Sequence, residues 1–169
     1  NPGALQDFQK ALEISPRHPY AHYGEGLVYK QEGNSPQALE KFKQVLEVDP
    51  SDPDTLYNLG LLYAREGKNA EAVAALRKAL EVQPANVSAR FRLASSLLAM
   101  GNKQEGEAEM ARFKELSASG TGVTLGLQYS EQGKYYFALT DYRSLPAPPA
   151  VQNGKTLRFT GVAPSESGL

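Results

Sequence analysis

Apolar residues recur at helical spacing along most of the chain, and the pattern itself repeats at a constant step, which separates Pro16, Pro50 and Pro84. Small residues, bulky residues and glycines keep the same step: Ala4, Ala38, Ala72 and Gly106; Phe8, Phe42, Leu76 and Met110; Tyr29, Tyr63 and Leu97; Gly33, Gly67 and Gly101. A constant interval as long as that between Pro16 and Pro50 is typical of stacked repeats, in which each unit buries its apolar face against its neighbour. The pattern therefore predicts a solenoid.

Two apolar stretches at helical spacing flank a glycine in each unit, which predicts an antiparallel helical hairpin. Gly26, Gly60 and Ala94 recur in the middle of the first helix. Glycine there costs about 1 kcal/mol relative to alanine, so its recurrence predicts close approach of a neighbouring helix. Ala38 and Ala72 are expected at the facing crossing points. The predicted helices are 2–14, 19–32, 35–48, 53–66, 69–82, 87–100, 103–116, 121–132 and 134–143.

The boundaries between hairpins carry stop and start signals. Pro50 cannot continue the preceding helix, Asp52 can cap the next one, and Pro53 suits its first turn. After the third unit, a slightly shorter step, as expected from a small deletion, predicts a fourth hairpin through Gly126, Tyr129, Gly133, Ala138 and Tyr142.

The unit at 53–86 resembles the tetratricopeptide-repeat (TPR) family, through Leu56, Tyr57, Asn58, Leu59, Gly60, Tyr63, Gly67, Ala72, Leu76, Ala79 and Pro84. The unit at 19–52 departs by having Glu25 where leucine is usual, and the unit at 87–120 lacks the closing proline. The resemblance spans roughly residues 2–143. It implies an all-α superhelix of about four hairpins plus an N-terminal half-repeat, divided into 1–18, 19–52, 53–86, 87–120 and 121–145 within a solenoid of residues 1–143.

The two ends of the chain suggest a larger parent protein. The chain starts in the second helix of a unit, so further repeats are expected upstream. Residues 144–150 read as a stiff proline-rich linker that opens an extended C-terminal tail, 144–169. Phe159 to Val162 and Glu166 to Leu169 resemble the opening of FG-GAP-like β-propeller domains of the ASPIC/UnbV type. That resemblance implies a bacterial envelope or secreted protein, whereas without it the cytoplasm is expected.

Composition narrows the class of function. The chain of 169 residues is 41% hydrophobic, and its 18 Lys+Arg nearly balance 19 Asp+Glu. Neither nucleic acid nor membrane insertion is therefore expected for this chain. It has no cysteine, which removes disulfides and thiolate chemistry. His18 and His22 have the spacing of a helical metal pair, but Pro19 disfavours helix at His18 and no third ligand is at hand, so no metal, no cofactor and no catalysis are predicted.

The first helices of TPR units line the concave groove of the superhelix, and this groove is the predicted binding site. Tyr23, Tyr57 and Phe91 recur at the repeat step and are expected to be anchors, with burial between hairpins as the alternative role. Lys30, Arg65 and Arg92 favour acidic partners. The full predicted set is Tyr23, Leu27, Lys30, Tyr57, Asn58, Leu61, Arg65, Phe91, Arg92 and Ser95.

Some TPR domains hold the acidic tail of a chaperone in a clamp of lysines, asparagines and an arginine. Asn58 and Arg92 match that clamp, whereas Tyr23, Leu27 and Ser88 do not. The predicted function is thus a non-catalytic scaffold that binds a protein or peptide of unspecified identity. The alternative is an intramolecular spacer or docking platform for a downstream propeller. Self-association through the terminal helix or the tail is a further expectation.

Overall fold

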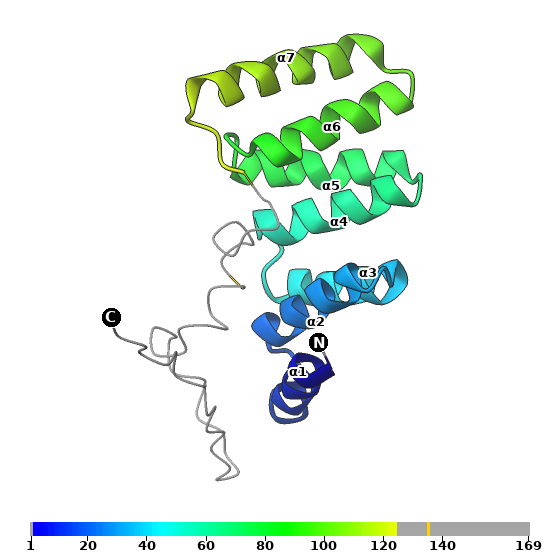
Figure 1. The fold of residues 1–169 in the computed structure, drawn as a ribbon, viewed down its shortest axis with the longest axis vertical. Coiled ribbons are helices and arrows are strands. Elements are labelled where there is room, and N and C mark those ends of the chain that lie inside the picture. Colours follow the sequence, from blue (N-terminus) through cyan, green and yellow to red (C-terminus); the bar gives the residue numbers. More distant parts are fainter. Residues whose placement is uncertain (1, 125–134, 136–169) are drawn as a thin grey trace, which may run out of the picture.

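The computed structural model describes residues 2–124 and Tyr135, and within them the chain is a stack of seven α-helices (Figure 1). A single helix, α1, precedes three hairpins, formed by α2 with α3, α4 with α5, and α6 with α7. The helix bounds are α1 Pro2–Ile14, α2 Pro19–Gln31, α3 Ser35–Val48, α4 Pro53–Arg65, α5 Asn69–Val82, α6 Val87–Ala99 and α7 Lys103–Ser119.

The first helix of every hairpin starts at a capping residue, and the three caps occupy equivalent positions of the repeat. Asp52 Oδ2 accepts the Thr55 amide at 2.8 Å, as predicted for this cap. Asn86 Oδ1 accepts the Ala89 amide at 2.9 Å in the third hairpin. His18 Nδ1 takes the same role at 3.3 Å from the Ala21 amide. Each cap satisfies one amide left unpaired at the start of a helix.

The turns inside the hairpins follow the glycine column. Gly33, Gly67 and Gly101 have φ angles of 78°, 73° and 82°, a left-handed backbone that glycine adopts without a Cβ penalty. This agrees with the predicted turn positions.

Small residues lie where the two helices of a hairpin cross. A Cβ added to Gly26 would lie 2.8 Å from Cε1 of Phe42, and one added to Gly60 would lie 2.5 Å from Cγ of Leu76. Ala94, the equivalent residue in α6, is completely buried. The predicted close approach at this column is confirmed, because side chains of the second helix occupy the space that a Cβ would need.

Among the residues that the structure describes, the core consists of two apolar clusters along the stack. One is centred on α4, α5 and α6 and includes Leu56, Leu76 and Leu97. The other joins α2 and α3 to α4 and α5. Each first helix therefore packs on its own partner, and α4 and α6 also pack on the second helix of the preceding hairpin.

A buried ion pair crosses the first hairpin. Glu25 is 2% exposed, and its Oε2 lies 2.8 Å from Nζ of Lys41 on α3. In the second hairpin the equivalent positions hold Leu59 and Ala75, which are both buried. The departure from leucine noted in the sequence is thus compensated by a charge on the facing helix.

The end of the third hairpin differs from the prediction. Helix α7 runs to Ser119 instead of residue 116, and Gly120 ends it with a φ of 68°. Residues 121–124, predicted to begin a helix, are not helical. Val123 instead pairs in parallel with Asn86, with hydrogen bonds of 2.8 Å to the Ala85 carbonyl and 2.9 Å from the Val87 amide.

The left-handed Gly120 turns the chain back, and Gly122 permits the contact because an added Cβ would lie 2.3 Å from Cγ1 of Val87. These backbone hydrogen bonds replace those of a new helical turn. The rest of the predicted helix 121–132, the predicted helix 134–143, the linker 144–150 and the propeller-like motif at 159–169 fall beyond what the structure describes, apart from Tyr135.

Candidate functional site

All ten predicted groove residues come from α2, α4 and α6, the first helices of the three hairpins. We call the surface that they line the candidate face. The structure brings three of them together in one polar network. The remaining seven divide between the core and the surface.

The network joins α2 to α4 through the side-chain amide of Asn58. Lys30 Nζ donates to Asn58 Oδ1 at 2.7 Å, and Asn58 Nδ2 donates to the Tyr23 hydroxyl at 3.1 Å. Nδ2 also donates to the Asp54 carbonyl at 2.9 Å, and Asn58 is only 3% exposed. The amide oxygen accepts a hydrogen bond from the Lys30 ammonium, so only one orientation of the Asn58 side-chain amide satisfies all three of its hydrogen-bond partners.

The charge of Lys30 is costly where it lies. Burial, with a smaller contribution from the nearby Arg65, lowers the pKa of Lys30 to about 8. Among the described residues, neither Lys30, Arg65 nor Arg92 forms an ion pair with a carboxylate. Desolvated positive charge without an ion-pair partner favours an anionic ligand.

The three predicted aromatic anchors differ in exposure. Tyr23 is fully buried and its ring packs edge to face on Phe42 at 5.5 Å. Tyr57 is 8% exposed and belongs to the cluster around α4. Phe91 is 38% exposed and its ring lies 5.2 Å from that of Phe113 on α7. Only Phe91 presents much of its ring to the surface.

The other members of the set support or border this surface. Leu61 is buried in the cluster around α4, and Leu27 packs partly buried against the other cluster. The guanidinium carbon of Arg92 lies 5.7 Å from the centre of the Phe91 ring, and Ser95 Oγ donates to the Phe91 carbonyl at 2.9 Å. Arg65 is exposed.

Sequence reasoning missed an aromatic site at the start of α2. The Tyr135 hydroxyl donates to Asp49 Oδ2 at 2.7 Å, and its ring packs on Tyr20. Tyr135 is 86 residues from Asp49 in sequence. No local pattern links residues so far apart, and Tyr135 itself falls in a predicted helix, so the sequence held no signal for this contact.

The two histidines have structural partners. His18 caps α2, and burial, followed by the neighbouring His22, lowers its pKa, which keeps Nδ1 available as an acceptor. His22 Nε2 donates to the Pro16 carbonyl at 2.8 Å. Both rings therefore fix the loop between α1 and α2.

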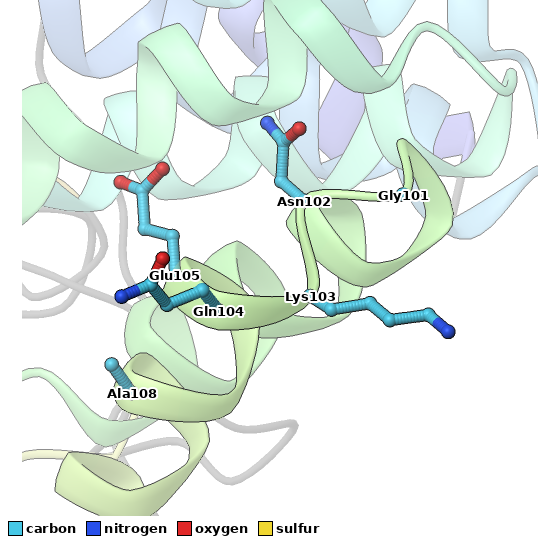
Figure 2. Close-up of a pocket in the computed structure, with 6 residues that line it drawn as sticks. All are labelled: Gly101, Asn102, Lys103, Gln104, Glu105 and Ala108. Carbon is cyan, nitrogen blue, oxygen red and sulfur yellow. The ribbon is translucent and has the colours of Figure 1, made fainter.

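Figure 2 shows a shallow pocket at the turn between α6 and α7, and none of the ten residues of the candidate face lines it. Its lining mixes polar and apolar residues, and Lys103 points out of it in this view. Glu105 is already paired with Arg77 of α5. The pocket thus lacks a convergent set of reactive groups. No helix in the described part of the chain is both long and apolar enough to cross a membrane.

Sequence profiles identify the repeats. The profile described as "TPR repeat" matches residues 26–67, and that described as "Tetratricopeptide repeat" matches residues 53–86. The comparison with curated protein sequences gave no match.

Solved structures have the same fold. The crystal structure of MamA aligns with a TM-score of 0.64 at 19% identity, over 66% of this chain and 66% of that one. MamA 41-end from Desulfovibrio magneticus RS-1 aligns at 0.63 and 23% identity, over 68% and 65%. The chain thus spans slightly less than two thirds of these MamA structures.

The first TPR of Spaghetti (RPAP3), bound to the HSP90 peptide SRMEEVD, aligns at 0.55 and 21% identity, over 58% of this chain and 80% of that one. At these identities the likeness establishes the fold. Together with the profile matches and the helix order, it shows that residues 26–86 are tetratricopeptide repeats within an all-α solenoid of the TPR type.

Proposed function

We propose that the chain is a non-catalytic scaffold that binds an acidic protein segment on the candidate face. One observation carries the proposal: the half-buried ammonium of Lys30 is held by Asn58 next to Arg65, without an ion-pair partner among the described residues. A carboxylate of a bound segment would supply the missing countercharge.

Two further findings support a protein partner. TPR solenoids expose an extended surface that suits a peptide or a second domain. The RPAP3 domain, which has this fold, holds a peptide whose sequence contains three acidic residues. The chaperone clamp itself is only partly present here, so the proposal concerns acidic segments in general.

The exposed and half-buried residues carry ligand contact in this proposal. Arg65, Arg92 and Lys30 supply charge, and Phe91 supplies an accessible aromatic surface. Tyr23, Tyr57 and Leu61 act from behind by fixing the helices that present these groups. Leu27, Asn58 and Ser95 complete the proposed site.

A peptide array tests the proposal. The full chain is applied to random heptapeptides, with SRMEEVD and SRMQQVN, in which amides replace its three carboxylates, included. Binders of the parent are expected to be enriched in Asp and Glu, and the enrichment is expected to disappear in the variant Lys30→Met/Arg65→Gln. Lys78→Gln, an exposed lysine on α5, is the matched control and should behave as the parent. Binders without acidic enrichment, or no binders, would contradict the proposal.

Binding should also depend on pH in a defined direction. With a pKa of about 8, Lys30 is charged at pH 7 and largely neutral at pH 9. The affinity for the best acidic peptide is expected to fall about tenfold over this range, corresponding to about 1.4 kcal/mol for the loss of one charge-assisted contact. Isothermal titration calorimetry at several pH values measures it. Lys30→Arg should bind with little change over this range, because arginine stays protonated.

The same pKa shift affects folding. The unfolded chain binds a proton at Lys30 up to about pH 10.5, whereas the folded chain releases it near pH 8. Between these values the unfolded state holds more protons, so the free energy of unfolding rises with pH in this window. Deprotonation of Lys30 above pH 8 therefore does not destabilise the fold, so a loss of peptide binding in this range could not be explained by unfolding caused by Lys30.

A further inference from the structure

Tyr135 occupies an aromatic site built by residues far upstream, which we call the tyrosine socket: Tyr20, Tyr23 and Asp49. Its ring stands edge to face on Tyr20, with centroids 4.8 Å apart and an interplanar angle of 84°. The Tyr23 ring is 5.8 Å away. Tyr135 is 7% exposed and belongs to the apolar cluster that contains Tyr23 and Phe42.

The socket recognises a phenol, not just a ring. Asp49 Oδ2 accepts the Tyr135 hydroxyl at 2.7 Å, while its other oxygen is 3.4 Å from Ser51 Oγ. Burial and this hydrogen bond raise the pKa of Tyr135, so the hydroxyl remains a donor. A phenylalanine would fill the same space but leave Asp49 without this bond, which is stronger than a neutral hydrogen bond because the acceptor is charged.

The repeat framework does not require the residues of the socket. The positions equivalent to Tyr20 are Asp54 and Ser88 in the next two units, and the position equivalent to Asp49 is Gln83. Neither of these hairpins combines a tyrosine at the position of Tyr20 with a carboxylate at the position of Asp49, yet both fold. The combination of Tyr20 and Asp49 is thus specific to the first hairpin.

The described residues just after α7 return to the start of α6. Gly120 reverses the chain, and Val123 pairs with Asn86 at the start of α6. Tyr135 follows Val123 by twelve positions. A chain of this length spans up to about 40 Å in extended form.

We propose that the tyrosine socket is a recognition site for a tyrosine carried on a protein segment, and that Tyr135 occupies it as an intramolecular competitor. The inference rests on the proposed function, because Tyr23 belongs both to the socket and to the network of Lys30 and Asn58. A partner with a tyrosine beside its acidic residues would displace Tyr135 and engage both parts of the site.

The chain of residues 1–169 and a fluorescein-labelled peptide with the sequence of residues 130–140 provide the test. The variant Tyr135→Ala frees the socket, and fluorescence anisotropy measures peptide binding. We expect the variant to bind at least tenfold more tightly than the parent, whose tethered tyrosine competes at an effective concentration of about millimolar. A peptide with phenylalanine in place of both Tyr135 and Tyr136 should bind at least fivefold more weakly. The chain variant Asp49→Asn/Tyr135→Ala should weaken the tyrosine peptide similarly.

Several outcomes would overturn the proposal. These are equal affinities of parent and Tyr135→Ala for the peptide, no binding to a Tyr135→Ala chain that retains its helical melt, or equal binding of the tyrosine and phenylalanine peptides. Should Tyr135→Ala unfold, Tyr135→Phe serves as the chain variant, with a smaller gain expected from loss of the Asp49 bond alone. A dimeric parent that becomes monomeric in Tyr135→Ala would place the occupant on a second copy and overturn intramolecular competition.

The proposed function fails separately from this inference. Lys30→Met in the Tyr135→Ala background should abolish binding of acidic array peptides while the labelled tyrosine peptide still binds. If the parent chain bound no acidic peptides on the array but Tyr135→Ala still bound the labelled tyrosine peptide, the proposed function would be wrong. The proposed role of the tyrosine socket would then still stand.

Discussion

Replacing Lys41 with alanine is expected to destabilise the fold by about 3 kcal/mol, because it strands a buried carboxylate. Glu25 is 2% exposed, and Lys41 Nζ is its ion-pair partner at 2.8 Å. The attraction between the two charges offsets the desolvation of both. Without Lys41 only the cost remains, so the free energy of unfolding, measured by urea denaturation with circular dichroism, should drop sharply.

The double variant Glu25→Leu/Lys41→Ala should recover this loss. It gives the first hairpin the residues that the second hairpin already has, Leu59 and Ala75, in a closely similar environment. Apolar replacement of a buried ion pair is often neutral or stabilising. We expect a free energy of unfolding within about 1 kcal/mol of the parent, or above it.

Lys78→Ala is the control for loss of a lysine, since this side chain is exposed on α5 and should matter by less than about 0.5 kcal/mol. If Lys41→Ala cost no more than this control, the ion pair would have no structural role. If the double variant remained as unstable as Lys41→Ala, the repeat equivalence of the two hairpins would be wrong.

Gly60→Val is expected to cost about 2 to 3 kcal/mol through overpacking at the crossing of α4 and α5. An added Cβ would lie 2.5 Å from Cγ and 2.8 Å from Cδ2 of Leu76. Leu76 is fully buried, so it has no open space to move into. The gain in helix propensity over glycine is too small to offset this clash.

Adding Leu76→Ala should partly restore the thermal and urea stability of Gly60→Val, because it removes the side-chain atoms that clash with the valine. The two single changes should therefore not add. Gly67→Ala is the matched control, because this turn glycine has a φ of 73° and no atom within 4 Å of an added Cβ. It should lose only about 1 kcal/mol, from backbone strain. Equal costs for Gly60→Val and Gly67→Ala would contradict close packing at the crossing.

Most of the fold could be predicted from the sequence, because the repeat specifies contacts between residues that are close in sequence. The helices α2 to α6 begin at the predicted residues, and the turn glycines have the expected left-handed backbone. Caps, prolines and glycines act through their own backbone, so the sequence is sufficient to place them. The helices that carry the candidate face follow from the same period.

The candidate site was less predictable. The repeat spacing places Tyr23, Tyr57 and Phe91 at equivalent positions, but it does not set their exposure. Tyr23 is covered from two sides, by Phe42 and by Tyr135, whereas Phe91 has only Phe113 beside it among the described rings. Position within a stack decides burial, and neighbours differ between the first and the last hairpin.

By itself, then, the sequence determined the hairpins, their turns and the close crossings at Gly26 and Gly60, since each arises from a local or once-repeated contact. Tertiary structure alone decided that Lys41 neutralises Glu25, that residues 121–124 return to α6, and that Tyr135 reaches Asp49. Those contacts join side chains outside the repeating columns, and whether they form depends on which surfaces the packed hairpins bring within reach.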